Sequence, residues 1–435
     1  MSGSSTCAAA QAALETAAAA GVEVCFANPG TTELPLVLAL DRIPAIRPVL
    51  CLHENVATGA ADAWGRLRGS PALALLHTGP GLANGMANLH NARKAKSPVV
   101  ALVGDHASWH RPADPPLAMD VEAAAATVAD AVLTVRRPDQ AAAWLAEAVA
   151  FARGRGGRVA VVNFPHDHQL APASGPAKPV APEPPSPPDP RALDAAADLL
   201  RRARRPCLYL GGAALFGEGL VLAGRIAAAC GASLISPTSF SRIETGCGLP
   251  PLLRLPYFPE KAQEVFDAHD AVVVLGARDP VAFFGHPDLP ARFLDSHPAV
   301  VRAAGPGDDV PAALSGLVER LGAKDATVPA GEPLPRARGP LDPVGLGAVF
   351  ARAVPEGGVV VLTAVSSAHV YSQLAQRAAP HTEIALTGGA IGEGTALAVG
   401  RRWRGRTCAS STSRRTAASP ICPPACGPRR ARGCG

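Results

Sequence analysis

Three segments near the start of the chain combine a carboxylate, an imidazole and several glycines in a pattern that could form one pocket. Each one includes or directly follows a short apolar run: FANPGTTELP at 26–35, LHENVATGAADAWGR at 52–66 and LLHTGPGLANGMANLHNA at 75–92. Their candidate site residues are Asn28, Pro29, Gly30, Thr31, Glu54, His77, Gly79, Gly81 and Asn84. Ligands bind outside the carboxyl ends of parallel strands, so three such loops favour a shared pocket over three unrelated turns.

Glu54 has two interpretations from the sequence alone. It opens an alanine-rich helical pattern at 54–68, where the helix dipole favours a carboxylate in the first turn. Small residues follow it, among them Ala57, Gly59 and Ala60, and they would allow close packing around a buried acid. A buried carboxylate usually has a partner or a chemical task. The sequence also leaves the role of His77 undecided, because a single histidine often has only a structural role.

Apolar runs that alternate with helical patterns position these loops. Residues 1–170 predict a domain with buried parallel strands at 22–27, 72–76, 99–104 and 159–164, and helices that include 54–68 and 138–153. A proline-rich linker follows at 171–190, then a second block at 191–325 with strands at 207–211 and 271–275. A third block at 340–400 has a strand at 359–362 and a glycine-rich turn at 387–394. This alternation predicts an α/β fold of consecutive doubly wound parallel-sheet domains.

Charge and cysteine content exclude several classes of protein. The net charge is +5, but residues 401–435 contain nine arginines and no acid, so the rest of the chain carries −4 and no nucleic-acid partner is predicted. Six of the ten cysteines are scattered through 1–400, which indicates reduced thiols in a cytoplasmic protein. Cys422 and Cys426 have a spacing that could suit zinc, but no histidine or second close pair accompanies them, so no metal site is predicted in this chain. We also expect no signal peptide and no membrane-spanning helix.

The three motifs, in this order, resemble the pyrimidine-binding domain of thiamine-diphosphate-dependent enzymes. The branch is that of acetolactate synthase, pyruvate oxidase and benzoylformate decarboxylase. The resemblance continues through NFPHD at 163–167, is weaker in the second block, and resumes at LTGGAIGEGTALAVG, which is similar to the opening of the diphosphate-binding domain. It therefore extends over most of residues 1–400. The fold that it implies is a pyrimidine-binding domain, a central Rossmann-like domain and an incomplete diphosphate-binding domain.

The resemblance implies roles for the candidate residues. The family's glutamate at the position of Glu54 hydrogen-bonds the aminopyrimidine and so promotes loss of the thiazolium C2 proton, and the resulting carbon nucleophile attacks a 2-oxo acid. His77 matches a proton-transfer histidine and Thr31 a serine near the substrate carboxylate. Cofactor contacts are implied for Asn28, Pro29, Gly30, Glu54, Gly79, Gly81, Asn84, Gly389 and Gly392. The implied cofactors are thiamine diphosphate and Mg²⁺, and the implied assembly is a homodimer or homotetramer that binds cofactor between subunits.

The end of the chain departs from this family. No Gly-Asp-Gly…Asn segment for Mg²⁺ follows the turn at 387–394. Residues 401–435 have no Leu, Val, Phe, Met or Tyr, and we expect them to form no strand or amphipathic helix. A shift of reading frame near Gly400 would explain this composition, and a divergent, solvated tail is the alternative. The sequence thus predicts a decarboxylase or carboligase of 2-oxo acids, or else an inactive remnant or scaffold.

Overall fold

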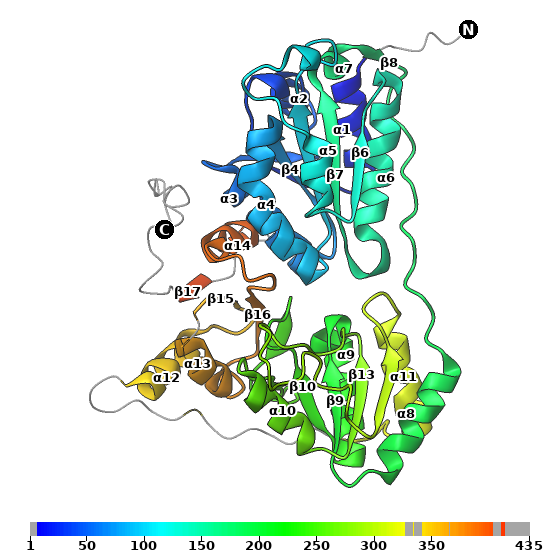
Figure 1. Cartoon of the computed structure of the whole chain (residues 1–435), viewed down its shortest axis with the longest axis vertical. Coiled ribbons are helices and arrows are strands. Elements are labelled where there is room, and N and C mark those ends of the chain that lie inside the picture. Colours follow the sequence, from blue (N-terminus) through cyan, green and yellow to red (C-terminus); the bar gives the residue numbers. More distant parts are fainter. Residues whose placement is uncertain (1–6, 327–333, 335–341, 365, 403–409, 414–435) are drawn as a thin grey trace. The chain divides into compact units, whose positions relative to one another are not determined.

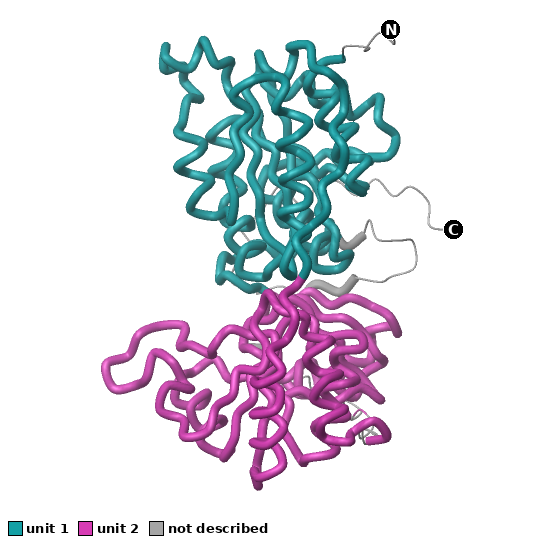
Figure 2. The backbone as a smooth tube through the Cα atoms, turned by 90° about the vertical axis from the view of Figure 1, so that its right-hand side faces the viewer, with its two compact units in different colours: residues 1–184, 386–406, 414–435 teal, residues 185–385, 407–413 magenta. Residues whose placement is uncertain are grey.

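The computed structural model describes residues 7–326, 334, 342–364, 366–402 and 410–413. These residues divide into two compact units, which Figure 2 shows in different colours. Unit 1 contains the described parts of 1–184 and 386–406, and unit 2 contains those of 185–385 and 407–413. Among the described residues, none of the helices combines the length and the apolar character that crossing a membrane requires.

Unit 1 is built on a six-stranded parallel sheet with strand order β3-β2-β4-β5-β7-β6. The strands are β2 (Val24–Asn28), β3 (Arg47–Leu50), β4 (Ala72–His77), β5 (Val99–Asp105), β6 (Ala131–Thr134) and β7 (Val159–Pro165). Side chains alternate between the two faces, so both faces of the central strands are apolar and buried. The four strands predicted from the sequence are confirmed within one or two residues at their ends.

Helices cover both faces of this sheet (Figure 1). One face packs against α1 (Ala9–Ala19), α2 (Leu34–Asp41) and α6 (Ala141–Arg153). The other packs against α3 (Glu54–Arg68), α4 (Thr78–Ala95) and α5 (Val121–Ala126). Helix α14 (Glu393–Arg402) packs on α3, where a Cβ on Gly59 would lie 2.6 Å from the Ala396 Cβ. A short pairing of β1 (Cys7–Ala8) with β8 (Pro172–Ala173) and the five-residue helix α7 (His166–Leu170) complete the unit.

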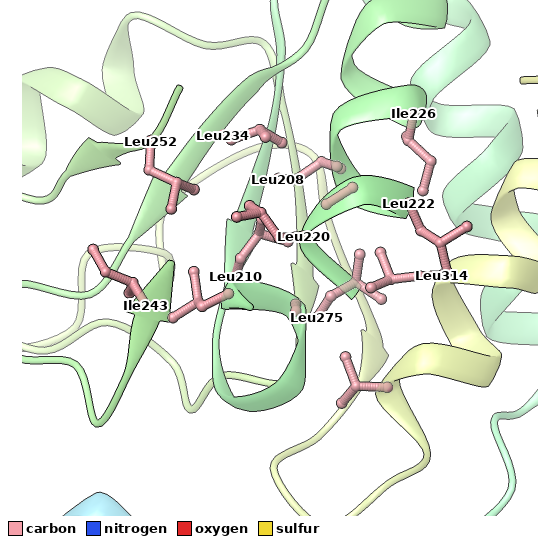
Figure 3. Packing of buried hydrophobic residues seen from close by; sticks show 14 of the residues in the cluster. Leu208, Leu210, Leu220, Leu222, Ile226, Leu234, Ile243, Leu252, Leu275 and Leu314 are labelled. Carbon is pink, nitrogen blue, oxygen red and sulfur yellow. The ribbon is translucent and has the colours of Figure 1, made fainter. Parts of the chain in front are cut away.

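Unit 2 contains a five-stranded parallel sheet with strand order β12-β10-β9-β13-β14. Its strands are β9 (Pro206–Leu210), β10 (Ser233–Ser236), β12 (Leu253–Arg254), β13 (Ala271–Leu275) and β14 (Val300–Ala304). Helices α8 (Pro190–Arg202), α9 (Gly217–Cys230) and α11 (Val310–Leu321) bury one face, and α10 (Pro259–Asp267) packs on the other. Figure 3 shows leucines of β9 and β13 facing those of α9 and α11. The α/β fold predicted from the alternating pattern is therefore confirmed.

A second sheet of unit 2 has strand order β11-β16-β15-β17. Strand β11 (Ile243–Thr245) is antiparallel to β16 (His381–Ala385), while β15 (Val359–Leu362) is parallel to both β16 and β17 (Ser410–Ser413). Helices α12 (Pro343–Ala353) and α13 (Ser366–Ala375) accompany it.

The expectation that 401–435 forms no strand is wrong at Ser410–Ser413. Pairing there with β15 uses backbone donors and acceptors, which need no apolar side chain. The rest of 403–435 lies outside the described residues, so the structure does not test the shift of reading frame.

Candidate functional site

The predicted site residues of unit 1 gather at the carboxyl edge of its sheet. Asn28 ends β2, His77 ends β4, and Glu54 opens α3 shortly after β3. Helix α3 begins where it does because the His53 side chain caps it by accepting a hydrogen bond from the Asn55 N–H at 3.1 Å. Asn28 Nδ2 donates to the Cys51 carbonyl at 2.8 Å and so ties the end of β2 to the segment that leads into α3.

Glu54 is buried, as the small residues behind it predict. Only 8% of the residue is exposed, and its Oε2 accepts a hydrogen bond from Asn84 Nδ2 at 3.1 Å. Its Oε1 faces Gly81, where an added Cβ would stand 3.0 Å from that oxygen and 3.4 Å from the His77 Cβ. No described residue donates to Oε1, so one carboxylate oxygen remains available as an acceptor beside a glycine.

Gly79, Gly81 and Asn84 belong to helix α4, so the prediction of a glycine-rich loop after His77 is wrong. The helix begins at Thr78, directly after β4, with Thr78 at a φ of 51°. Glycine destabilises the interior of a helix, but at these positions it allows neighbouring side chains to approach the backbone closely. A Cβ at Gly79 would overlap Met119, and one at Gly85 would lie 2.8 Å from Thr58 Cγ2. Tertiary packing therefore overrides the local preference of these glycines.

His77 is held by a residue that we did not predict from the sequence, Glu33. Glu33 is completely buried, and its Oε2 accepts hydrogen bonds from the Gly30 N–H at 2.7 Å and from His77 Nδ1 at 2.8 Å. Its Oε1 accepts from the Thr32 hydroxyl at 2.5 Å. A carboxylate can only accept, so Nδ1 of His77 carries the hydrogen and Nε2 is free to accept or transfer a proton.

The signal for Glu33 was its spacing, because a glutamate three residues after Gly30 suits a turn in which the acid caps the Gly30 N–H. Gly30 is required here for a further reason, since a Cβ at this position would overlap the His77 ring. Thr31, in the 3₁₀ turn η1 (Thr31–Glu33), is exposed, whereas Thr32 Oγ1 lies 3.2 Å from His77 Nδ1. The hydroxyl beside His77 is therefore that of Thr32.

Gly389 and Gly392 lie elsewhere in unit 1, in the turn before α14, with φ values of 78° and 96°. Asn91 near the end of α4 holds this turn by accepting hydrogen bonds from the Gly388 N–H at 3.1 Å and the Ala390 N–H at 3.2 Å. Arg66, which donates to Thr387 in the same turn, stands twelve residues along α3 from Glu54, or about 18 Å at 1.5 Å per residue. The structure therefore does not bring these two glycines to the strand-end residues of the same chain.

A buried charge network joins α14 to α3. Asp62 and Glu393 are completely buried around Arg66, whose Nε donates to Asp62 Oδ1 at 2.8 Å, and Asn91 Nδ2 donates to Glu393 Oε2 at 2.9 Å. Burial, and then the charge of Asp62, raise the pKa of Glu393 well above its ordinary value, although Arg66 and Asn91 oppose the shift. Two carboxyl groups that share one guanidinium are neutral overall only if one of them keeps its proton, so Glu393 is the protonated member.

The described residues offer no group of three or more His, Cys, Asp or Glu side chains that could hold a metal ion. Mg²⁺ prefers carboxylate and carbonyl oxygens in octahedral arrangement, so these residues do not fit a side-chain magnesium site.

The buried thiols of Cys25 and Cys51 are free, and burial raises the pKa of each to about 12. They are therefore protonated at neutral pH and are not nucleophiles.

The chain is similar in sequence to proteins of one enzyme family. Residues 8–124 match the family described as thiamine pyrophosphate enzyme, N-terminal TPP binding domain. The chain is 39% identical over 399 residues to a Mycobacterium tuberculosis protein whose name describes it as an acetolactate synthase large subunit, IlvX. The match covers 90% of this chain and 75% of that protein. It is 26% identical over 432 residues to benzoylformate decarboxylase of Pseudomonas aeruginosa, covering 87% and 75%.

Solved structures share the fold. The thiamine diphosphate-dependent 4-hydroxybenzoylformate decarboxylase of Rhodococcus jostii superimposes with a TM-score of 0.80 at 21% sequence identity. The match covers 93% of this chain and 80% of that one. Benzoylformate decarboxylase of Polynucleobacter necessarius gives a TM-score of 0.73 at 20% identity.

Proposed function

Because this chain belongs to the thiamine-diphosphate-dependent enzyme family that includes acetolactate synthases and benzoylformate decarboxylases, we propose that it binds thiamine diphosphate at the strand-end site. We further propose that it acts on 2-oxo acids, by decarboxylation or by joining the decarboxylated fragment to a second carbonyl compound. Bound thiamine diphosphate supplies an electron sink for carbanion chemistry, while the protein supplies orientation, electrostatics and proton transfer.

The observation that carries the proposal is the environment of Glu54. Its carboxylate is buried, one oxygen is held by Asn84, and the other faces Gly81 without a protein donor among the described residues. A buried acceptor of this kind is suited to an N–H group of a heterocycle, because a charge-assisted hydrogen bond offsets the loss of water. Glu54 Oε1 would therefore hold the aminopyrimidine ring.

The Glu33–His77 pair supplies a candidate proton carrier for the same site. Glu33 fixes the ring of His77 through Nδ1, and the side chain of His77 is 25% exposed, so solvent or substrate can reach the imidazole. Orientation of an imidazole by a buried carboxylate is a common arrangement for general acid–base catalysis. In this proposal His77 Nε2 gives or takes the proton at the substrate.

We also propose that the active form is a homodimer or homotetramer. The family resemblance implies a cofactor held between the first domain of one subunit and the third of another. The separation of about 18 Å along α3 between Glu54 and the Arg66 end of the helix is compatible with a second copy that supplies Gly389 and Gly392. Size-exclusion chromatography with light scattering tests this, and a monomer at all concentrations with full activity would contradict it.

Turnover by the purified full chain tests the proposed reaction. Pyruvate, benzoylformate and other 2-oxo acids would be supplied with thiamine diphosphate and Mg²⁺, and carbon dioxide, aldehyde and ligation products would be measured. We expect product that depends on thiamine diphosphate and is abolished in Glu54→Gln. Glu23→Gln is the matched control, because Glu23 is an exposed acid paired with Arg68 on the surface. Absence of product from every acid would contradict the proposed reaction.

An inactive remnant or scaffold that pairs with a complete homologue is the second candidate. It is favoured by the lack, among the described residues, of any His, Cys, Asp and Glu cluster suited to a metal ion. Calorimetric titration with thiamine diphosphate and Mg²⁺ separates the two candidates: saturable binding supports the enzyme, and no heat of binding supports the scaffold.

A further inference from the structure

Unit 2 contains a cavity of about 640 Å³ that is distinct from the strand-end site. It is lined by residues of α9, β10, β11, β12, α13 and β16 and of the chain between β11 and β12. None of its lining residues belongs to unit 1. Pockets that bind small molecules typically measure about 300–1,000 Å³ and combine apolar walls with a few polar groups.

One part of the cavity wall is aliphatic. Leu234, Ile243 and Leu252 are almost completely buried and line the cavity, and the C-terminal half of α9 contributes only small residues there, including Ala227 and Ala228. Figure 3 shows Ile243 and Leu252 on the opposite side of the hydrophobic cluster from Leu314. This wall would accommodate an apolar group of a few carbon atoms.

A cation with unused donors lies among the polar lining residues. Arg254 Nε donates to the Thr238 carbonyl at 2.7 Å, and the guanidinium lies over the Phe240 ring, 5.3 Å from its centroid. These two contacts fix the plane of the group. No described residue accepts a hydrogen bond from its terminal N–H groups, and burial lowers the pKa of Arg254, with Glu383 opposing the shift. A guanidinium held in this way presents a fork suited to a carboxylate.

A hydroxyl with no partner stands beside this arginine. Ser236 is 1% exposed, lines the cavity, and its Oγ has no hydrogen-bond partner among the described residues. Ser236 of β10 and Arg254 of β12 are register partners in a parallel pair, so their side chains leave the sheet on the same face. A buried hydroxyl without a partner is costly unless a water or ligand completes it.

The acid in the cavity wall limits the charge of an occupant. Glu383 is 1% exposed, and its Oε1 lies 3.3 Å from Nε2 of His381, which also contacts the Tyr371 hydroxyl at 3.0 Å. One arginine with free donors therefore shares the cavity with one carboxylate. A second negative charge on a ligand would be repelled by Glu383 without a second cation to offset it.

We propose that this cavity binds a small monocarboxylic acid with an aliphatic body. The carboxylate accepts hydrogen bonds from the terminal N–H groups of Arg254 and from Ser236 Oγ, and the aliphatic part packs against Leu234, Ile243 and Leu252. The binding is independent of thiamine diphosphate, so it stands or falls separately from the proposed function.

Calorimetric titration of the full chain with 4-methylpentanoate tests the proposal. We expect saturable binding with a Kd of about 1 mM or tighter, which lies well within the limit that the size of the ligand sets. Binding should weaken by about tenfold or more in Arg254→Met, because the charge-assisted hydrogen bonds are lost. Arg242→Met is the matched control: Arg242 also lies over a phenylalanine, Phe216, but does not line the cavity. It should bind as the wild type does.

A second variant keeps the test independent of the folding of Arg254→Met. Ala228→Trp would fill the cavity from the exposed end of α9 without altering Arg254, and we expect it to abolish binding while its thermal unfolding stays close to that of the wild type. Three further probes define the ligand class: 4-methylpentanamide, glutarate and inorganic phosphate should each bind more weakly. Equal binding of the amide, preference for phosphate or glutarate, no binding of 4-methylpentanoate, or unchanged binding in Ala228→Trp would each overturn the proposal.

Discussion

Replacement of Glu33 by glutamine should destabilise the protein strongly, although it changes one atom. The Glu33 carboxylate is completely buried and accepts from three donors, the Gly30 N–H, the Thr32 hydroxyl and His77 Nδ1, at 2.5–2.8 Å. Glutamine has a single acceptor oxygen. If that oxygen replaces Oε2, the bonds from Gly30 and His77 survive as neutral bonds, while the new NH₂ group faces the Thr32 hydroxyl and Gly104.

The size of the effect follows from these contacts. Converting two charge-assisted bonds to neutral ones costs about 1 kcal/mol each, and one poorly paired buried donor costs about 1–3 kcal/mol. We therefore expect Glu33→Gln to lower the free energy of unfolding by about 3–5 kcal/mol, measured by urea denaturation followed by circular dichroism. Glu23→Gln is the control. Its partner Arg68 is partly exposed, and such surface pairs contribute about 0–1 kcal/mol.

The same variant should weaken the preference of His77 for one tautomer. In the wild type, the contact with Glu33 places the hydrogen on Nδ1, and nitrogen-15 spectra of histidine-labelled protein should detect this form, with His77→Gln identifying the signal. Glu33→Gln should reduce its population. The proposed role of this pair would be refuted if Glu33→Gln were as stable as Glu23→Gln, or if His77 of the wild type carried its hydrogen on Nε2.

Three further predictions concern the helices that frame the site. Because the pKa of Glu393 is raised in the folded protein, the unfolded chain loses this proton above about pH 4.5 while the folded protein keeps it, so the contribution of Glu393 to stability falls as pH rises. In urea titrations between about pH 5 and 8, the wild type should therefore lose stability relative to Glu393→Gln. A difference between the two proteins that stays constant with pH would contradict the raised pKa. Arg66→Met leaves Asp62 buried without its cation and should cost about 3–5 kcal/mol in the same assay, whereas a loss below about 1 kcal/mol would show that the pair is dispensable. Gly81→Ala adds a Cβ 3.0 Å from Glu54 Oε1 and should impair binding of thiamine diphosphate, yet leave thermal stability unchanged or slightly higher because alanine favours helices by about 1 kcal/mol; unimpaired binding would contradict the close approach.

The sequence predicted the interior strands and helix α3 well because their patterns are strong. The buried strands β2, β4, β5 and β7 are continuous apolar runs, and α3 begins at Glu54 and ends at Arg68 as expected. The edge strands β3 and β6 were missed. Strand β3 contains an exposed arginine and proline, and β6 is only half-buried, so neither has the apolar continuity that marks a central strand.

The candidate site was predicted in part, for a physical reason. Asn28, Glu54 and His77 lie at the ends of apolar runs, so the sequence located them, but the role of Glu33 depends on a contact across forty-four residues with His77. The glycines of α4 were misread as a loop because their close approaches to Glu54, Met119 and Thr58 exist only in the packed fold. Contacts between distant segments leave no local pattern in the chain.

Binding of thiamine diphosphate to the wild type and to Glu54→Gln, measured by calorimetry in the presence of Mg²⁺, tests the central claim most directly. We expect saturable binding to the wild type and a weakening of roughly 10- to 150-fold in Glu54→Gln, the equivalent of about 1.5–3 kcal/mol for one charge-assisted hydrogen bond. Equal affinity for the two proteins would contradict the role of the buried carboxylate, and no binding to either would contradict the cofactor assignment for this chain.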